Sequence, residues 1–148
     1  MIRFEFIPEK CSACGACAVA CMDQNDIDIP GGETPFRLVA RREVNGTSEY
    51  SSSACRHCAD APCAAVCPTG AMFRDEETGL VLSDRVRCVG CRRCAGACPY
   101  GAVSFFRRSG ETRAKAEKCH GCRGRVLSGL LPACVKACPV EALLFRNE

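Results

Sequence analysis

The chain has 148 residues, a net charge of +3, only 6% aromatic residues and sixteen Cys. A small chain with so few large apolar side chains cannot bury a large core, and such domains usually depend on metals or cross-links. Residues 1–6 lack the pattern of a secretory signal, which argues against eight disulfides in a secreted protein. No apolar run is long enough to cross a bilayer. We therefore expect a cytoplasmic protein with reduced thiols and no direct membrane span, although export with a signal-bearing partner stays open.

The predicted elements are short and follow one another closely along the chain. Apolar or alternating runs predict strands at residues 3–7, 72–74, 80–82, 103–106 and 143–145. The dipeptide Asn45-Gly46 predicts a hairpin between residues 36–44 and 47–51. Cysteine-rich segments separate these elements. The pattern indicates an α+β fold of short strands and short helices.

The sixteen cysteines form four groups of four, and each group ends in C-x3-C. Groups one and three have the compact spacing C-x2-C-x2-C-x3-C, whereas group two has a wider second gap and group four an eleven-residue excursion. No cysteine is left over. The groups are Cys11, Cys14, Cys17 and Cys21; Cys55, Cys58, Cys63 and Cys67; Cys88, Cys91, Cys94 and Cys98; and Cys119, Cys122, Cys134 and Cys138.

In groups two, three and four the last cysteine is followed by Pro. This is the run in which three cysteines bind one [4Fe–4S] cluster and the cysteine before Pro binds another. C-x3-C advances about one helical turn, roughly 6 Å, and Pro ends the segment because it has no N–H to donate. Group one has Met22 in place of Pro, so its helix is expected to continue. The pattern predicts four [4Fe–4S] clusters and a ferredoxin-like fold.

Zinc is the main alternative, because two C-x2-C-like pairs in group four could form a four-thiolate zinc site. Three cysteines within seven residues favour a cubane [4Fe–4S] cluster over a zinc ion with tetrahedral coordination. His57 and His120 each lie inside a C-x2-C segment, and we expect them to supply a hydrogen bond or a charge near a cluster. There is no paired-carboxylate, nucleophile or phosphate-loop motif. The sequence therefore predicts no catalytic residues.

Bound clusters would also change the charge of the protein. Four thiolate-ligated clusters would add about eight negative charges. The twenty Lys and Arg residues are therefore expected to act as counter-charge and as solvated surface, and we expect no nucleic-acid partner.

Over residues 10–144 the cysteine groups resemble, in order and spacing, the four-cluster electron-transfer subunits of molybdopterin oxidoreductases, such as those of DMSO reductase, formate dehydrogenase and tungsten aldehyde oxidoreductases. The resemblance implies two dicluster modules, an outer one at residues 1–50 and 109–148 and an inner one, inserted in it, at residues 51–108. It implies electron transfer between a large molybdenum- or tungsten-pterin subunit and a second carrier or flavin subunit. The chain lacks long insertions and a C-terminal anchor, which favours a soluble assembly with an aldehyde- or formate-oxidising subunit. Cys91 stands where some relatives that hold a [3Fe–4S] cluster have another residue, so we expect [4Fe–4S] throughout.

The resemblance also implies an exchange of ligands between groups one and four and between groups two and three. The implied sets are Cys11, Cys14, Cys17 and Cys138; Cys21, Cys119, Cys122 and Cys134; Cys55, Cys58, Cys63 and Cys98; and Cys67, Cys88, Cys91 and Cys94. It further implies a linear series of clusters whose group-one end faces the catalytic subunit. Three alternatives stay open: a free polyferredoxin, an electron-transfer partner of a hydrogenase or carbon monoxide dehydrogenase, and a non-redox zinc module.

Overall fold

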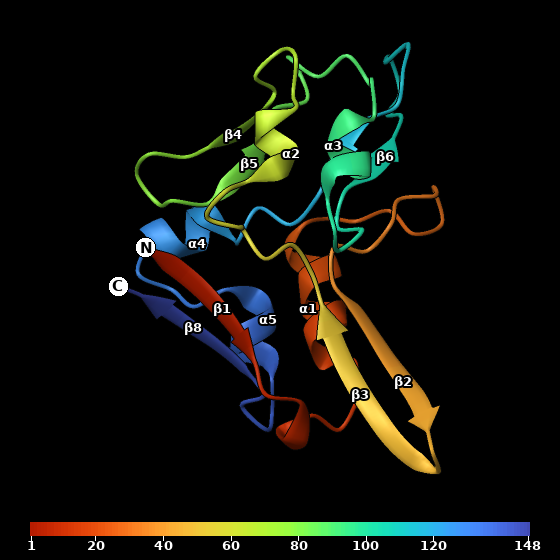
Figure 1. The fold of residues 1–148 in the computed structure, drawn as a ribbon, viewed down its shortest axis with the longest axis vertical. Helices are drawn as coiled ribbons and strands as arrows, with labels where there is room; N and C mark the ends of the chain where they lie inside the picture. Colours follow the sequence, from red (N-terminus) through yellow and green to blue (C-terminus); the bar gives the residue numbers. More distant parts are fainter.

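The computed structural model describes all residues, Met1–Glu148, and its two ends lie side by side. Strand β1 (Ile2–Phe6) pairs antiparallel with β8 (Leu143–Asn147), as Figure 1 shows. Phe4 lies opposite Phe145 in this pair, with ring centroids 5.5 Å apart in an edge-to-face arrangement. The first and last segments of the protein are therefore joined by both backbone pairing and side-chain packing.

Three further antiparallel pairs connect segments closer in sequence. The first is the predicted hairpin, β2 (Leu38–Val44) with β3 (Thr47–Ser53), whose turn residues Asn45 and Gly46 have φ of 51° and 76°. Positive φ at both central residues suits the right-handed strand twist. The others are β4 (Met72–Arg74) with β5 (Val81–Ser83) and β6 (Ser104–Phe106) with β7 (Lys115–Glu117).

The strand predictions are confirmed to within two residues, but β7 was missed. Its sequence, Lys-Ala-Glu, carries neither β-branched nor aromatic residues, so local propensity does not mark it as a strand. Pairing with β6 supplies the backbone hydrogen bonds that its own sequence does not favour.

The helices are short, and four of them begin at or just before the third cysteine of a group. They are α1 (Ala16–Gln24), α2 (Pro62–Ala65), α3 (Arg93–Ala97) and α5 (Ala133–Ala137); a 3₁₀ turn, η1 (Pro8–Lys10), and α4 (Arg123–Leu127) complete the set. Helix α1 continues beyond Cys21 as predicted, because Met22 can donate the N–H that Pro lacks. Helix α4 occupies part of the excursion in group four. None of the helices has the length and apolar character needed to cross a membrane.

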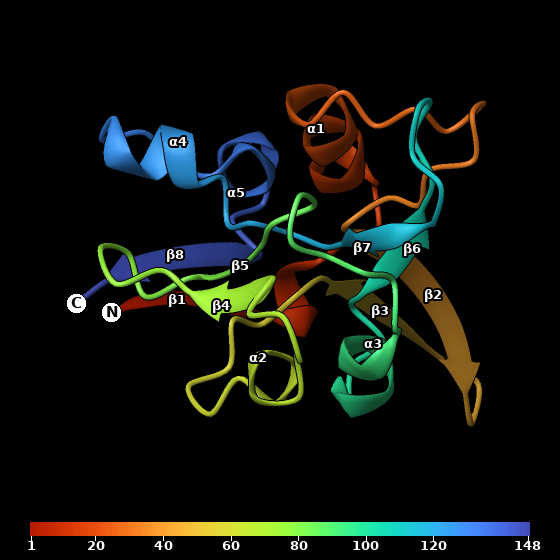
Figure 2. The ribbon, with the colours of Figure 1, turned by 90° about the horizontal axis from the view of Figure 1, so that it is seen from above.

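The helices that follow the cysteine groups pack in two pairs. Helix α1 of group one contacts α5 of group four, and α2 of group two contacts α3 of group three. In Figure 1, α2, α3, β4 and β5 lie in the upper part of the molecule, whereas β1, β8, α1 and α5 lie below them. The view from above in Figure 2 again separates the α2 and α3 helices from α1 and α5.

The hydrophobic core is small and contains many of the cysteines. Only 25 of the 148 residues are buried. One group of buried hydrophobic side chains contains Cys63, Cys94 and four apolar residues, and a second contains Cys17, Cys134 and Leu143. The cysteines thus occupy the positions that aliphatic side chains fill in an ordinary domain.

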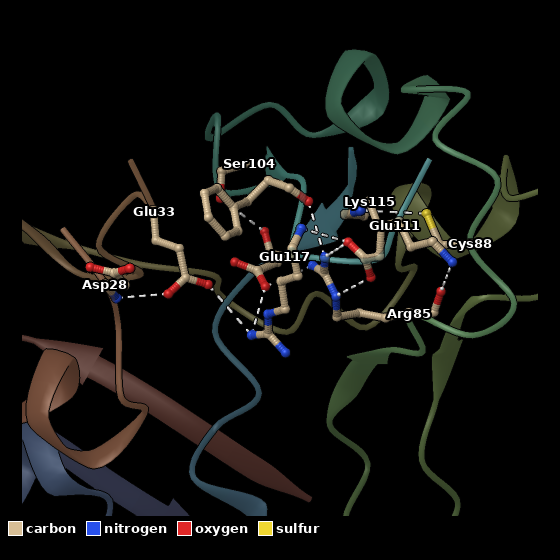
Figure 3. Close-up of polar contacts among 11 residues, drawn as sticks. Asp28, Glu33, Arg85, Cys88, Ser104, Glu111, Lys115 and Glu117 are labelled. Atoms are coloured by element: carbon tan, nitrogen blue, oxygen red, sulfur yellow. Dashed lines mark hydrogen bonds and ion pairs between the residues drawn. The ribbon is translucent and has the colours of Figure 1, made fainter. Parts of the chain in front are cut away.

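A network of charged side chains ties the loops around β6 and β7 together (Figure 3). Arg85 donates to Glu111 at 2.5 Å and to Glu117 at 2.7 Å. Arg108 lies 2.9 Å from Glu117 and 3.4 Å from Glu33, which belongs to the loop before β2. Glu33 and Glu117 are both buried, so breaking these contacts would leave buried carboxylates without a charged partner.

Candidate iron–sulfur centres

Four cavities of similar size lie in the structure, each lined by four cysteines. Counted with their open mouths they enclose about 310 to 360 Å³ each. Their cysteines are Cys11, Cys14, Cys17 and Cys138 in site 1; Cys21, Cys119, Cys122 and Cys134 in site 2; Cys55, Cys58, Cys63 and Cys98 in site 3; and Cys67, Cys88, Cys91 and Cys94 in site 4. Each cavity is lined by three cysteines of one group and the last cysteine of another.

Backbone N–H groups point at the first cysteine of three groups. The residue two positions after that cysteine is Ala13, His57 or Gly121, with φ of 56°, 49° and 64°. In this left-handed conformation their N–H groups donate to the preceding Sγ at 3.4, 3.4 and 3.3 Å. Hydrogen bonds of this kind favour the thiolate over the thiol. The cysteine loops are thus arranged to hold negative charge on sulfur.

A second set of N–H groups points at the cysteines that precede Pro. The N–H of Ala142 donates to Cys138 Sγ at 3.2 Å, that of Ala102 to Cys98 Sγ at 3.5 Å, and that of Met72 to Cys67 Sγ at 3.4 Å. Burial raises the pKa of the Cys138 thiol, but the N–H groups of the turn outweigh it and hold the pKa below its usual value. The Cys-Pro turn therefore ends the helix and also stabilises the thiolate.

Cys21 has no Pro after it, and a side chain in place of the turn donates a hydrogen bond to its sulfur. Asn25, at the end of α1, donates from Nδ2 to Cys21 Sγ at 3.5 Å and to the Cys21 carbonyl at 2.7 Å. Asn25 was not predicted as a functional residue, because nothing in its local sequence separates it from an ordinary polar residue at a helix end.

The four sites differ in their exposure to water. Cys14 in site 1 and Cys91 in site 4 are exposed, whereas sites 2 and 3 contain no exposed cysteine. Burial raises the pKa of Cys21 to about 11 and that of Cys119 to about 12. These two thiols therefore stay protonated at neutral pH unless a bound cation stabilises the thiolate.

The two histidines are placed near the sites and are neutral at pH 7. His57 is buried, and its Nδ1 accepts the N–H of Val81 at 3.1 Å, so its proton lies on Nε2. Burial and the nearby charge of Lys118 lower the pKa of His57 to about 3. His120 lines site 2, its Nε2 lies 2.5 Å from Asn25 Oδ1, and burial lowers its pKa. The ring of His57 bonds to Val81 and that of His120 to Asn25, and neither ring carries a charge. A hydrogen bond from either ring to a cluster stays a prediction.

A close approach of two backbone segments explains why a glycine lies beside Cys91. A Cβ on Gly90 would be 2.5 Å from the carbonyl oxygen of Ala114, and its φ is +72°. Gly90→Ala is expected to cost about 2–4 kcal/mol of stability, because left-handed strain and a clash with backbone add together. The measurement is loss of visible iron–sulfur absorption with increasing urea. Gly46→Ala, which has similar φ and nothing within 4 Å, is the matched control and should cost about 1–2 kcal/mol. Equal sensitivity of the two variants would contradict the close-approach argument.

The donor set at the four sites fits four [4Fe–4S] clusters. All sixteen cysteines are free, each lines a cavity, and many of them accept N–H donors. Thiolates are the ligands on which such clusters depend. That these thiols bind the iron of one cluster at each site stays a prediction.

Comparison with known proteins agrees with this donor set. A family described as "4Fe-4S dicluster domain" matches residues 46–148, and a second family with the same description matches residues 10–71. The ferredoxin-like protein YdhX of Escherichia coli K12 is 36% identical over 99% of this sequence and 66% of its own length. The thiosulfate reductase electron transfer subunit PhsB of Salmonella typhi is 38% identical, with 93% and 71% covered. One polypeptide of the anaerobic dimethyl sulfoxide reductase of Haemophilus influenzae is 37% identical, with 96% and 72% covered.

The sequence spans about two thirds of the length of the curated relatives that it matches. The family matches favour iron–sulfur clusters over the zinc alternative for the cysteine groups. We conclude that this protein belongs to the 4Fe-4S dicluster family of ferredoxin-like electron-transfer proteins, with sixteen cysteines that fit four [4Fe–4S] clusters.

Proposed function

We propose that the protein is a non-catalytic electron-transfer subunit. It would conduct single electrons along four [4Fe–4S] clusters between a large catalytic subunit of the molybdenum- or tungsten-pterin class and a second electron carrier. The similarity to PhsB and to the dimethyl sulfoxide reductase polypeptide, both parts of reductases by name, supports this role. The observation that carries it is the set of four cavities, each lined by four cysteines, within one small protein.

We further propose that the four cysteines lining each site bind one cluster, so that every group lends its last cysteine to another group's cluster. When bound, a thiolate-ligated [4Fe–4S] cluster takes up and releases one electron at a potential set by hydrogen bonds, charge and exposure. The protein's own residues hold the cluster, exclude water and aim N–H groups at the sulfurs. The packing of α1 on α5 and of α2 on α3 supports the exchange, because Cys21 lies on α1 and the other exchanged cysteines lie within two residues after the ends of α2, α3 and α5.

Contacts between neighbouring sites support a linear order from site 1 to site 4. Cys17 of site 1 and Cys134 of site 2 belong to one group of buried hydrophobic side chains, and Cys63 of site 3 and Cys94 of site 4 belong to the other. Lys118 links sites 2 and 3, as described below. The exposed cysteines lie in sites 1 and 4, where electrons would enter and leave. We assign site 1 to the catalytic partner, following the family resemblance.

The proposed modules are an outer one, residues 1–50 and 109–148, and an inner one, residues 51–108, inserted in it. Pairing of β1 with β8 supports the outer module, and the β4–β5 pair with helices α2 and α3 supports the inner one. Strand β7 belongs to the outer segment but pairs with β6 of the inner segment. The two modules would therefore share one strand pair.

Anaerobic purification from the native host tests the proposal. We expect broad visible absorption, EPR signals on reduction, about sixteen iron atoms per protein, and co-purification with a large pterin-containing subunit. A brown monomer at native abundance would favour the free polyferredoxin, and a nickel-containing partner would favour a hydrogenase or carbon monoxide dehydrogenase. A colourless zinc protein would contradict the proposal. The cytoplasmic location stays a prediction that fractionation of the host would test.

A further inference from the structure

Only two of the twenty Lys and Arg side chains are buried, and both lie beside cysteines. Lys118 is 3% exposed and Arg37 is 5% exposed. Neither forms an ion pair with a carboxylate, unlike Arg85 and Arg123, which do. A buried cation is costly unless an anion or a full set of hydrogen bonds compensates it. The surroundings of these two side chains therefore indicate which anion they face.

Lys118 lies between sites 2 and 3. Its Nζ donates to the carbonyls of Val81 and Cys119, the latter at 3.0 Å, and lies 3.6 Å from Cys55 Sγ. Cys55 lines site 3, as Lys118 itself does, and Cys119 lines site 2. Three acceptors surround Nζ, and only the charged ammonium has three N–H groups to give them. The geometry thus fixes a positive charge at the junction of these two sites.

Arg37 occupies the corresponding place between sites 1 and 2. Its Nη1 donates to the Ser52 carbonyl at 3.2 Å and to Ser52 Oγ at 3.0 Å. Ser52 Oγ lies 3.3 Å from Cys17 Sγ of site 1, and Arg37 itself lines site 2. Burial raises the pKa of Cys134 in site 2, and the charge of Arg37 opposes that rise. Site 2 thus has a buried cation toward each of its neighbours.

We infer that Lys118 and Arg37 raise the reduction potentials of the clusters at sites 2 and 3, the two sites without an exposed cysteine. The inference rests on the proposed function. Burial disfavours the reduced cluster, because reduction adds negative charge where water cannot stabilise it. A fixed buried cation stabilises the reduced form more than the oxidised form. The charges of these two residues act on the reduction potentials of the clusters, and neither residue has a catalytic role.

The experiment is an EPR-monitored potentiometric titration of the anaerobically purified holoprotein. The measurement is made at the potential where the cluster of site 2 or site 3 is half reduced in the native protein. At that potential, Lys118→Met should lower the cluster's reduced-to-oxidised ratio about tenfold, which corresponds to about 59 mV for one electron. Lys118→Arg should stay near the native titration, because it keeps the charge. Arg37→Met and Arg37→Lys form a second, independent pair. Arg42→Met, which removes an exposed charge on β2, should leave all potentials unchanged.

The outcomes separate charge from structure. Unchanged potentials in iron-replete Lys118→Met and Arg37→Met would overturn the inference, and so would equal shifts in the neutral and the charge-keeping variants. If Lys118→Met loses iron, Lys118→Gln keeps donors for the two carbonyls without the charge. If both neutral variants lose iron and Lys118→Arg keeps it, the result supports a role for the positive charge. If Lys118→Arg loses iron as well, the inference is overturned. A native protein without iron–sulfur EPR signals would instead contradict the proposed function.

Discussion

Removal of iron from the holoprotein is expected to unfold most of the molecule. The larger of the two groups of buried hydrophobic side chains has only six members, and two of these are cysteines that line the cavities. The strands form four separate two-stranded pairs, and such pairs are marginal by themselves in water. Where a metal site forms only in the folded state, the free energy of metal binding contributes to the free energy of folding. Without clusters, the thiols would line hollows that nothing fills.

The measurement is far-UV circular dichroism and amide hydrogen exchange after anaerobic chelation of iron with the thiols kept reduced. We expect exchange protection to fall to near zero in α1, α2, α3 and α5, the helices that carry the third cysteine of each group. Reconstitution with ferrous iron and sulfide should restore both signals. An iron-free protein that kept native protection in these helices would show that the hydrophobic core is sufficient.

Local sequence determined much of the fold. Asn45-Gly46 predicts the hairpin because few other residue pairs adopt positive φ at two successive positions. Met22 in place of Pro predicts the longer helix α1 for an equally local reason. Strand β7 could not be predicted, because its pairing with β6 depends on a segment about ten residues away and on the charge network around Arg85.

The residues around the cysteines were harder to predict than the cysteines themselves. The spacing of the cysteines identifies them as ligands, because the backbone must surround a cubane [4Fe–4S] cluster within a few residues. Arg37 and Ser52 reach the sites across tertiary contacts, and their neighbours in sequence give no signal of this. Lys118 precedes Cys119 directly, but a Lys beside a ligand is more often exposed. Its burial depends on β5, which supplies the Val81 carbonyl.

Exchange of ligands between distant groups has the most direct test, in which iron is counted in single and double variants. Cys138 lies more than a hundred residues from Cys11, yet both line site 1, whereas Cys134, one helical turn before Cys138 on α5, lines site 2. Cys138→Ala should lose the cluster of site 1 and leave about twelve iron atoms. Adding Cys11→Ala should remove no further iron, because both changes affect the same cluster. Adding Cys119→Ala should reduce the count to about eight.

The matched control uses the neighbouring cysteine, which lies on α5, whereas Cys138 directly follows that helix. Cys134→Ala combined with Cys119→Ala should leave about twelve iron atoms, and combined with Cys11→Ala about eight. The reverse pattern, in which Cys138 pairs with Cys119 and Cys134 with Cys11, would contradict the proposed sets. If Cys138 and Cys134 both paired with Cys119, group four would be a self-contained site and the exchange would be wrong. Agreement with the expected pattern would mean that the two ends of the protein are joined through a shared cluster, as they are through β1 and β8.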